Sequence, residues 1–227
     1  EVLTTDPGPP LWMSDPQRFP QLLEGFRTLK TGIHPFDPTQ GNKVLLVTGS
    51  DRQVGSSTVA FNLALILAWD FLDQPILLVN SNIADPSLHR VFGVDLEPGL
   101  MNYLNEEQPL EHIVRPSIRP NLDLVSAGRR PPNILSPFDL QRFVAFLDEA
   151  RQRYAYVVVD SAPILRSSDA RTILAKVDAA VVVVEAGRSR YEVINEIRNQ
   201  LSGNATLLGC VLNKRRFLIP GSLYSHV

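Results

Sequence analysis

The loop Thr48-Gly49-Ser50-Asp51-Arg52-Gln53-Val54-Gly55-Ser56-Ser57-Thr58 joins an apolar run at 44–47 to an apolar helical stretch at 59–71. Strand, loop and helix in this order are the context that the phosphate-binding pattern G-x-x-x-x-G-K-[ST] requires. In such a loop, backbone N–H groups and a helix N-terminus face the bound anion. The sequence therefore predicts a phosphate-binding loop (P-loop) near the start of an α/β domain.

The match to this pattern is incomplete. Gly55 takes the position of the second glycine, and Ser57 that of the hydroxyl that reaches magnesium. Serine replaces the first glycine at position 50 and the lysine at position 56, so the cation that would reach the β- and γ-phosphates is missing. We expect ATP or ADP with magnesium to bind weakly or not at all. The residues of this degenerate nucleotide site would be Ser50, Arg52, Gly55, Ser56, Ser57 and Thr58.

The rest of the chain alternates apolar runs with amphipathic segments. Continuous apolar runs of this kind are typical of parallel strands that are buried on both faces. Alternation of strands and helices predicts a single doubly wound α/β domain, with a mostly parallel sheet, helices on both faces and the site at the carboxyl ends of the strands. Ser136 and Pro137 mark one helix start, and the spacing of Ser189 and Glu192 predicts a capping box at another. The predicted strands are 44–47, 76–79, 122–125, 156–159, 179–184 and 207–212.

Composition narrows the setting of the protein. A formal net charge of -2 over 227 residues gives no reason to expect a nucleic-acid partner. Cys210, the single cysteine, lies in an apolar run, where a buried and unreactive thiol is expected. The apolar stretch 59–71 is too short to span a bilayer, so a cytoplasmic domain is expected. We divide the chain into an extended arm at 1–20, a domain at 21–217 and a tail at 218–227.

Three further strand ends should meet the loop. The strand 76–79 is followed by Asn80 and Asn82, the strand 156–159 by Asp160, and the strand 207–212 by Asn213. An amide is a poor magnesium ligand and cannot act as a base, so the two asparagines either form a degenerate acidic motif or bond to local backbone. Asp160 either joins Ser57 as a magnesium ligand, if a metal binds at all, or orders a turn.

The chain from about 24 to 213 resembles the cytoplasmic catalytic domain of bacterial tyrosine kinases of the capsular and exopolysaccharide biosynthesis family, relatives of the partitioning ATPases. The resemblance is carried by the loop, by Asp160-Ser161-Ala162-Pro163, by Ala127-Gly128-Arg129-Arg130-Pro131-Pro132-Asn133 and by a helix with Glu24, Arg27 and Lys30. In that family, Asn213 matches a residue that contacts the purine, although a turn-forming asparagine is the alternative. The helix resembles the family's oligomerisation helix, although a solvated helix face is equally open.

The departures from the family pattern all weaken catalysis. Phosphoryl transfer depends on positioning and on neutralising negative charge, and here the lysine and two carboxylates are absent. Asp51 stands where the partitioning relatives carry a signature lysine, and a carboxylate there would repel phosphate unless Arg52 compensates. Only Tyr224 lies near the chain end, where the family carries a tyrosine-rich target segment.

These departures favour a pseudokinase-like regulator or scaffold of exopolysaccharide polymerisation and export. The alternative is an active ATP-dependent tyrosine autokinase, and a partitioning-type ATPase fits less well. The resemblance implies self-association and a partner, the cytoplasmic segment of a membrane polysaccharide co-polymerase. Through that partner the protein would sit peripherally at the inner face of the membrane.

Overall fold

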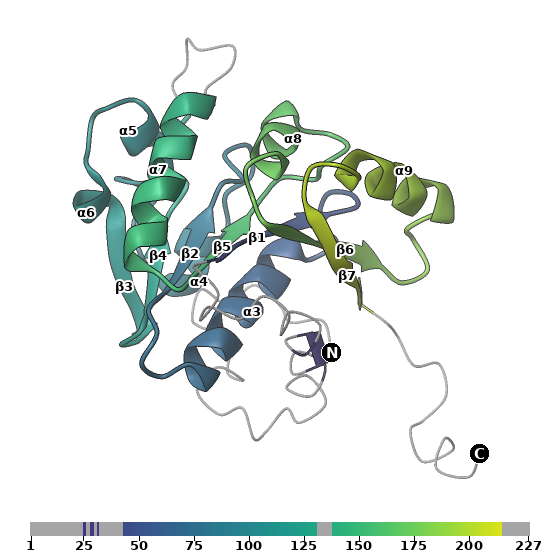
Figure 1. Cartoon of the computed structure of the whole chain (residues 1–227), viewed down its shortest axis with the longest axis horizontal. Helices are drawn as coiled ribbons and strands as arrows, with labels where there is room; N and C mark the ends of the chain where they lie inside the picture. The colour runs from purple at the N-terminus through teal and green to yellow at the C-terminus, as the bar shows by residue number, and fades with distance from the viewer. Residues whose placement is uncertain (1–24, 26–27, 30, 32–42, 131–137, 215–227) are drawn as a thin grey trace.

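The computed structural model describes residues 25, 28–29, 31, 43–130 and 138–214, and this part of the chain forms one α/β domain (Figure 1). Its sheet has seven strands in the order β3-β4-β2-β5-β1-β6-β7. Neighbouring strands are parallel except for the β3–β4 pair at one edge, which is antiparallel. The strands are β1 (Lys43–Gly49), β2 (Ile76–Asn80), β3 (Val114–Arg119), β4 (Leu122–Val125), β5 (Tyr156–Asp160), β6 (Ala179–Glu185) and β7 (Thr206–Asn213).

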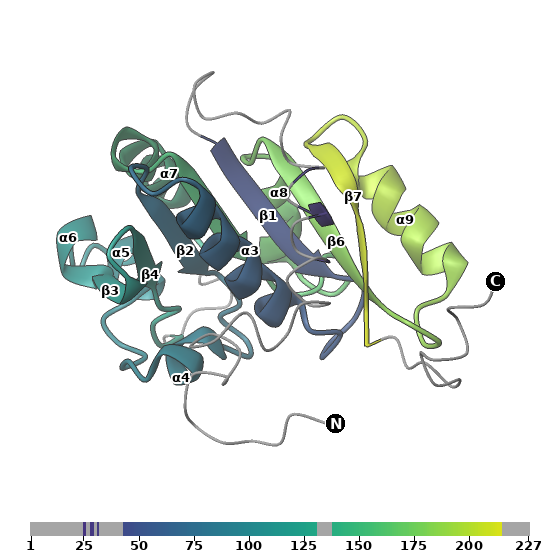
Figure 2. The same cartoon turned by 90° about the horizontal axis from the view of Figure 1, so that it is seen from below.

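Helices cover both faces of the sheet, as Figures 1 and 2 show. The described helices are α3 (Ser56–Asp70), α4 (Leu88–Phe92), α5 (Leu100–Leu104), α6 (Leu110–Ile113), α7 (Leu140–Arg153), α8 (Ser168–Leu174) and α9 (Tyr191–Leu201). One apolar core joins the sheet to α3 and α4, and the other joins it to α5, α6, α7, α8 and α9. The predicted mostly parallel, doubly wound sheet is confirmed.

The central strands are short, β-branched and buried at every position, which is why they read as unbroken apolar runs. Successive residues alternate between the two cores: Val158 belongs to the α3 core, while Val157 and Val159 belong to the other. Helix α3 is buried at every position from 59 to 68, as expected for a helix that is apolar on all sides.

One strand, β3, is not among the strands predicted from the sequence. Strand β3 alternates exposed and partly buried residues, carries Pro116 and pairs only with β4. Proline is tolerated at such an edge position because no neighbouring strand requires its missing N–H. A search for continuous apolar runs could not find this strand, since an edge strand has a half-exposed pattern.

Of the two predicted helix starts, Ser136 and Pro137 lie outside the described residues, and the capping box of Ser189 and Glu192 is wrong. Helix α7 is capped by Asp139, whose carboxylate accepts from the Arg142 N–H at 3.1 Å. Helix α9 has Arg190 at its cap without a side-chain hydrogen bond, because the Ser189 hydroxyl is engaged elsewhere. The capping-box spacing was therefore coincidental.

The prediction for Cys210 is also wrong. Its side chain is exposed, since β7 is an edge strand with only partly buried positions. Partial burial still raises the pKa of its thiol. The apolar run 207–212 indicated a buried strand. At the edge of a sheet, however, a strand has a neighbouring strand on one side only, so its residues are less covered.

Candidate functional site

The loop between β1 and α3 is held open by its backbone. Gln53 and Gly55 both have positive φ angles, 59° and 91°, which bend the chain into a concave turn of the kind that binds anions. Within the described part of the chain, the N–H groups of residue 53 and of residues 55–58 donate to no backbone carbonyl, and the first such bond of α3 is Val59 N–H to Gly55 O at 3.0 Å. The N-terminus of α3 also lacks a side-chain cap and an acidic residue in its first turn. The loop therefore offers a set of uncommitted donors.

The end of β7 fixes the outer side of this loop. The Asn213 side-chain amide donates to Val54 O at 2.8 Å, and the Lys214 ammonium donates to Gln53 O at 2.6 Å. A Cβ at Gly55 would collide with the Asn213 amide. Asn213 thus helps to hold the loop, a role that the sequence did not indicate, and its predicted contact with a purine stays a prediction. A second fastening joins the Ser50 and Ser189 hydroxyls at 2.9 Å, and Ser50 is buried.

Asp51 does not stand alone in the loop. Its carboxylate lies 2.7 Å from Nε of Arg166, in the segment after β5, and 3.7 Å from Nη2 of Arg188, in the segment after β6. A hydrogen bond from the Arg52 N–H lowers the pKa of this carboxyl most; desolvation opposes the shift, and the two arginines lower it further. Asp51 thereby ties together three loops at the carboxyl edge of the sheet, and its charge is compensated by neighbours that the sequence pattern did not reveal.

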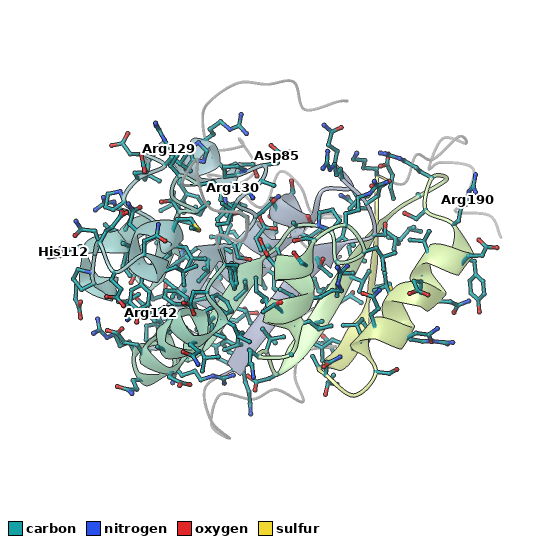
Figure 3. All side chains as sticks on the ribbon, turned by 90° about the horizontal axis from the view of Figure 1, so that it is seen from above. Asp85, His112, Arg129, Arg130, Arg142 and Arg190 are labelled. Atoms are coloured by element: carbon teal, nitrogen blue, oxygen red, sulfur yellow. The ribbon has the colours of Figure 1, made fainter. Side chains whose placement is uncertain are left out.

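Arg52 itself is exposed, and the part of the chain that the structure describes gives its guanidinium no ion pair. Thr58 is exposed as well, whereas Ser56 and Ser57 are partly buried at the start of α3. The expected compensation by Arg52 therefore stays a prediction. Figure 3 labels two more arginines, Arg129 and Arg130, which follow β4 in the chain, and Arg129 forms an ion pair with Glu97 at 3.3 Å.

The strand ends beside the loop bring Asp160 and Asn80 together. The two residues are register partners on β5 and β2, and Asp160 is also paired with Val47 on β1. Both side chains are on the α3 face of the sheet, because they continue the alternation of residues that belong to the α3 core. Both residues are completely buried. The convergence of strand ends that the sequence predicts is thus present.

Neither side chain is satisfied. Both Asp160 carboxylate oxygens and Asn80 Nδ2 lack a hydrogen-bond partner among the described residues. Burial raises the pKa of the Asp160 carboxyl to about 7, and the nearby Ser57 hydroxyl offsets this only in part, without reaching full hydrogen-bond geometry. Orphaned buried polar atoms are rare, and they point to an absent water, ion or ligand.

The two asparagines do bond to local backbone, as one of the alternatives required. Asn80 Oδ1 accepts from the Asn82 N–H at 3.1 Å, and Asn82 Oδ1 accepts from the Asp85 N–H at 3.3 Å. These bonds shape the turn after β2. They use the amide oxygen of Asn80 and leave its Nδ2 donor free.

The donor set offers magnesium the minimum that the ion usually takes from a protein. The ion prefers oxygen ligands and usually takes one or two carboxylates besides the substrate phosphates. Here the site offers one carboxylate, Asp160, and the Ser57 hydroxyl. No group of three or more His, Cys, Asp or Glu side chains in the described ranges is placed to hold a metal.

The predicted oligomerisation residues Glu24, Arg27 and Lys30 lie outside the described residues. Their helix is described at four positions, all helical: Gly25, Thr28, Leu29 and Thr31. Leu29 packs against the α3 core, while the other three are exposed. The inward apolar side of this helix is therefore supported at Leu29, and the role of its charged residues stays a prediction.

Comparison with known proteins gives a consistent set of relatives. No family model matches the chain. The chain is 31% identical over 196 residues to a putative tyrosine-protein kinase, EpsB, of Ralstonia nicotianae, covering 84% of this chain and 25% of that protein. It is 27% identical to the tyrosine-protein kinase YwqD of Bacillus subtilis, covering 85% of this chain and 81% of YwqD. The chain thus spans about a quarter of the Ralstonia relative but most of the Bacillus one.

Solved structures agree with these relatives. The kinase domain of VpsO superposes with a TM-score of 0.74 at 28% identity, covering 88% of this chain and 98% of that domain. The kinase domain of the Escherichia coli tyrosine kinase ETK superposes with a TM-score of 0.70 at 26% identity, and the match covers 78% of this chain and 71% of that domain. A plasmid partition protein from Borrelia burgdorferi has a TM-score of 0.60 at 17% identity, and this likeness shows a shared fold alone.

A search of the described helices finds none with the length and apolar character needed to cross a membrane. The sheet order, the phosphate-binding loop between β1 and α3, and the relatives all lead to one assignment. The chain belongs to the bacterial tyrosine-protein kinase family, and its described part has the P-loop fold of that family's kinase domains.

Proposed function

We propose that this protein is a member of the tyrosine-kinase family that no longer transfers phosphate and acts as a regulator or scaffold. The observation that carries the proposal is a loop that keeps its donor geometry next to an altered set of charged groups. Ser56 supplies no cation, and Asn80 supplies an amide donor where the family pattern has a carboxylate. Loop shape is thus retained while the groups that act on the transition state are gone.

The expected catalytic loss is large. Removing one donor that stabilises a transition-state charge costs about 10²–10³ in rate. The lysine and the carboxylate motif act on the same transferring group, so their joint absence should leave a negligible rate even if nucleotide binds. The loss of one charge-assisted hydrogen bond weakens binding by about 1.5–3 kcal/mol, or roughly one to two decades. ATP with magnesium should therefore bind only weakly.

The test is incubation of the full chain with ATP and magnesium, followed by mass spectrometry for phosphotyrosine. We expect none, on Tyr224 or elsewhere. Stoichiometric phosphate on Tyr224 would establish the second candidate function, an active autokinase, which the retained Asp160 and the open loop favour. As a matched variant, Ser56→Lys with Asn80→Asp and Asn82→Asp should regain some ATP binding with little phosphorylation.

The surviving function that we propose is assembly. By the family resemblance, the partner is the cytoplasmic segment of a membrane polysaccharide co-polymerase, which would hold the protein at the inner face of the membrane during exopolysaccharide polymerisation and export. Self-association would use the charged residues Glu24, Arg27 and Lys30, which form a strip of mixed sign along one helix edge. Surface ion pairs of this kind contribute about 0–1 kcal/mol each, so association should depend on salt and concentration.

Analytical ultracentrifugation tests this assembly. Arg27→Glu with Lys30→Glu should shift oligomers toward monomer while circular dichroism stays unchanged. Thr28→Glu, an exposed neighbour on the same helix, controls for added negative charge. If the charge-reversed and wild-type chains sediment identically, alone and with the co-polymerase segment, this helix is not the contact surface.

A further inference from the structure

The two edges of the described sheet are protected to different degrees. An edge strand carries a row of unpaired N–H and C=O groups, and native proteins usually protect such a strand with charges or prolines. Strand β3 follows this rule, since it carries Arg115, Pro116 and Arg119. Strand β7 lies at the opposite edge (Figure 1) and has eight residues, none of them charged and none of them proline. Of these two edges, β7 is therefore the one that is open to a further strand.

The regular part of this edge is the run 209–213. Leu208 is an extra residue in the pairing with β6, and the register is continuous from Gly209 onward. The Asn213 carbonyl accepts from the Ala186 N–H, directly after β6. Backbone groups alternate in direction along a strand, so Val211 also faces β6. The N–H and C=O groups of the alternate residues, 210 and 212, therefore point away from the sheet.

The described part of the chain leaves Cys210 and Leu212 uncovered. No described strand lies beyond β7, and no described loop backbone bonds to either residue. Their register partners Val182 and Val184 are buried in the core that includes α9, whereas Cys210 is exposed and Leu212 is 57% exposed. At these two positions the apolar face of the sheet extends beyond its cover, beside backbone groups that lack a neighbouring strand.

A second copy of β7 matches this edge in one register. A two-fold axis pairs two identical edge strands in antiparallel orientation. An axis at Val211, the centre of the regular run, sets Cys210 of each copy opposite Leu212 of the other copy and on the same face. The outward N–H and C=O groups of these two residues then bond to each other. No like charges meet across the pair, since the run 209–213 contains no charged residue.

We propose that two copies of this chain associate through β7, so that one sheet continues across a two-fold axis at Val211. This surface is separate from the charged helix edge that we propose for assembly, and it does not depend on the loss of phosphoryl transfer. A single pair of short strands makes a small interface, so the dimer should be weak and should depend on protein concentration.

Disulfide trapping in the full chain tests the register. In a non-hydrogen-bonded antiparallel pair, opposed Cα atoms lie about 4.5 Å apart, and a disulfide spans about 4.4–6.8 Å. Val211→Cys with Cys210→Ser places a single thiol on the axis and should give a covalent dimer on mild oxidation. Leu212→Cys with Cys210→Ser is the matched control, because residues 212 of the two copies lie diagonally, about 7–8 Å apart.

The control position separates pairing from collision. Leu212 is more exposed than Val211, so random encounters would crosslink position 212 at least as fast as position 211. A dimer yield at 211 that does not exceed the yield at 212 would overturn the proposal. It would do so even where the chain's own residues 215–227 occupy this edge.

A charge exchange tests the same pairing without oxidation. Cys210→Lys with Leu212→Lys sets like charges opposite each other and should weaken self-association in sedimentation equilibrium about tenfold or more. Cys210→Lys with Leu212→Glu sets opposite charges there and should restore association to within about threefold of wild type. Equal weakening by the two double variants would contradict this register.

The result is separable from the proposed function. In a chain that also carries Arg27→Glu and Lys30→Glu, the crosslink at position 211 should persist. Its loss there would show that β7 is not an independent surface. Phosphotyrosine on the wild-type chain would refute the loss of catalysis, whatever the crosslinking shows.

Discussion

Replacing Asp160 by asparagine should have a more stabilising effect on the fold at pH 8 than at pH 5. Burial raises the pKa of the Asp160 carboxyl from 3.8 to about 7 in the folded chain. Between these values the folded state holds a proton that the unfolded state has released. The free energy of unfolding of the wild type therefore falls as pH rises through this window. Asparagine has no proton to lose, so the variant lacks this dependence.

The size of the effect follows from the two pKa values. From pH 5 to pH 8, a carboxyl with a pKa of about 7 when folded and 3.8 when unfolded removes about 2–3 kcal/mol of stability. The difference in the free energy of unfolding between wild type and variant should therefore change by about that amount between pH 5 and pH 8. The amide of the variant lacks a partner just as the acid does, and any cost of about 1–3 kcal/mol from this source is the same at both pH values. The difference between the two pH values therefore isolates the charge.

The assay is urea unfolding of both chains at pH 5 and pH 8 in EDTA, with the slope m compared to check that the two chains expose the same surface. Asp148→Asn, an exposed aspartate on α7, is the matched control and should shift by less than about 0.5 kcal/mol at either pH. An equal effect of Asp160→Asn at both pH values would show that the carboxylate is not desolvated, and the reasoning on this site would fail.

Three further predictions test the loop and its supports. Gly55→Ala should lower stability by at least about 1 kcal/mol, measured by urea unfolding, because a positive φ and the Asn213 amide exclude a Cβ. Asp51→Asn should release Arg166, while Arg188 keeps its ion pair with Glu185, and should tighten ATP binding severalfold in calorimetry, with stability changed by under about 1 kcal/mol; unchanged affinity would show that Arg166 does not reach the ligand. Asp178→Ala should cost about 1–3 kcal/mol in thermal unfolding, since its carboxylate accepts from the Val44 N–H at 2.7 Å; a loss below 0.5 kcal/mol would contradict this role.

The sequence was sufficient for the fold because the central strands are buried on both faces. Their unbroken apolar runs and the loop after β1 fix the parallel sheet and the place of the site. The edges were less predictable for the same reason. Strand β3 has the alternation of a half-exposed strand, and Cys210 lies in an apolar run that turns out to be an edge. The hydrophobic pattern of a strand indicates how many of its faces are buried, but it does not show which strand lies at the edge of the sheet.

The sequence predicted which residues lie together at the candidate site, but it did not predict the hydrogen bonds and ion pairs that they form. Motif spacing brought Asn80 and Asp160 to the loop, and the register confirms that they are neighbours. No motif indicated that Arg166 and Arg188 would neutralise Asp51, because these ion pairs join loops far apart in sequence. The only available signal was that Arg166 follows the strand 156–159, whose end was predicted to meet the loop; the strand before Arg188 was not among those predicted to do so. Which of the two Asn80 side-chain polar atoms is left without a partner depends on the turn geometry after β2, which spacing alone does not encode.

The fastening between the end of β7 and the loop has a thermodynamic consequence. Asn213 and Lys214 hold the carbonyls of Val54 and Gln53, the outer side of the same peptide segment whose N–H groups would face an anion. Any ligand that stabilises this loop geometry must also stabilise the contacts at the end of β7. Because linkage between sites is reciprocal, an interaction that strains or supports Lys214 must change loop affinity by the same factor. Under the proposed function, the protein could in this way report the occupancy of its loop without transferring phosphate, through equilibrium coupling between a loop ligand and the last residues of the sheet.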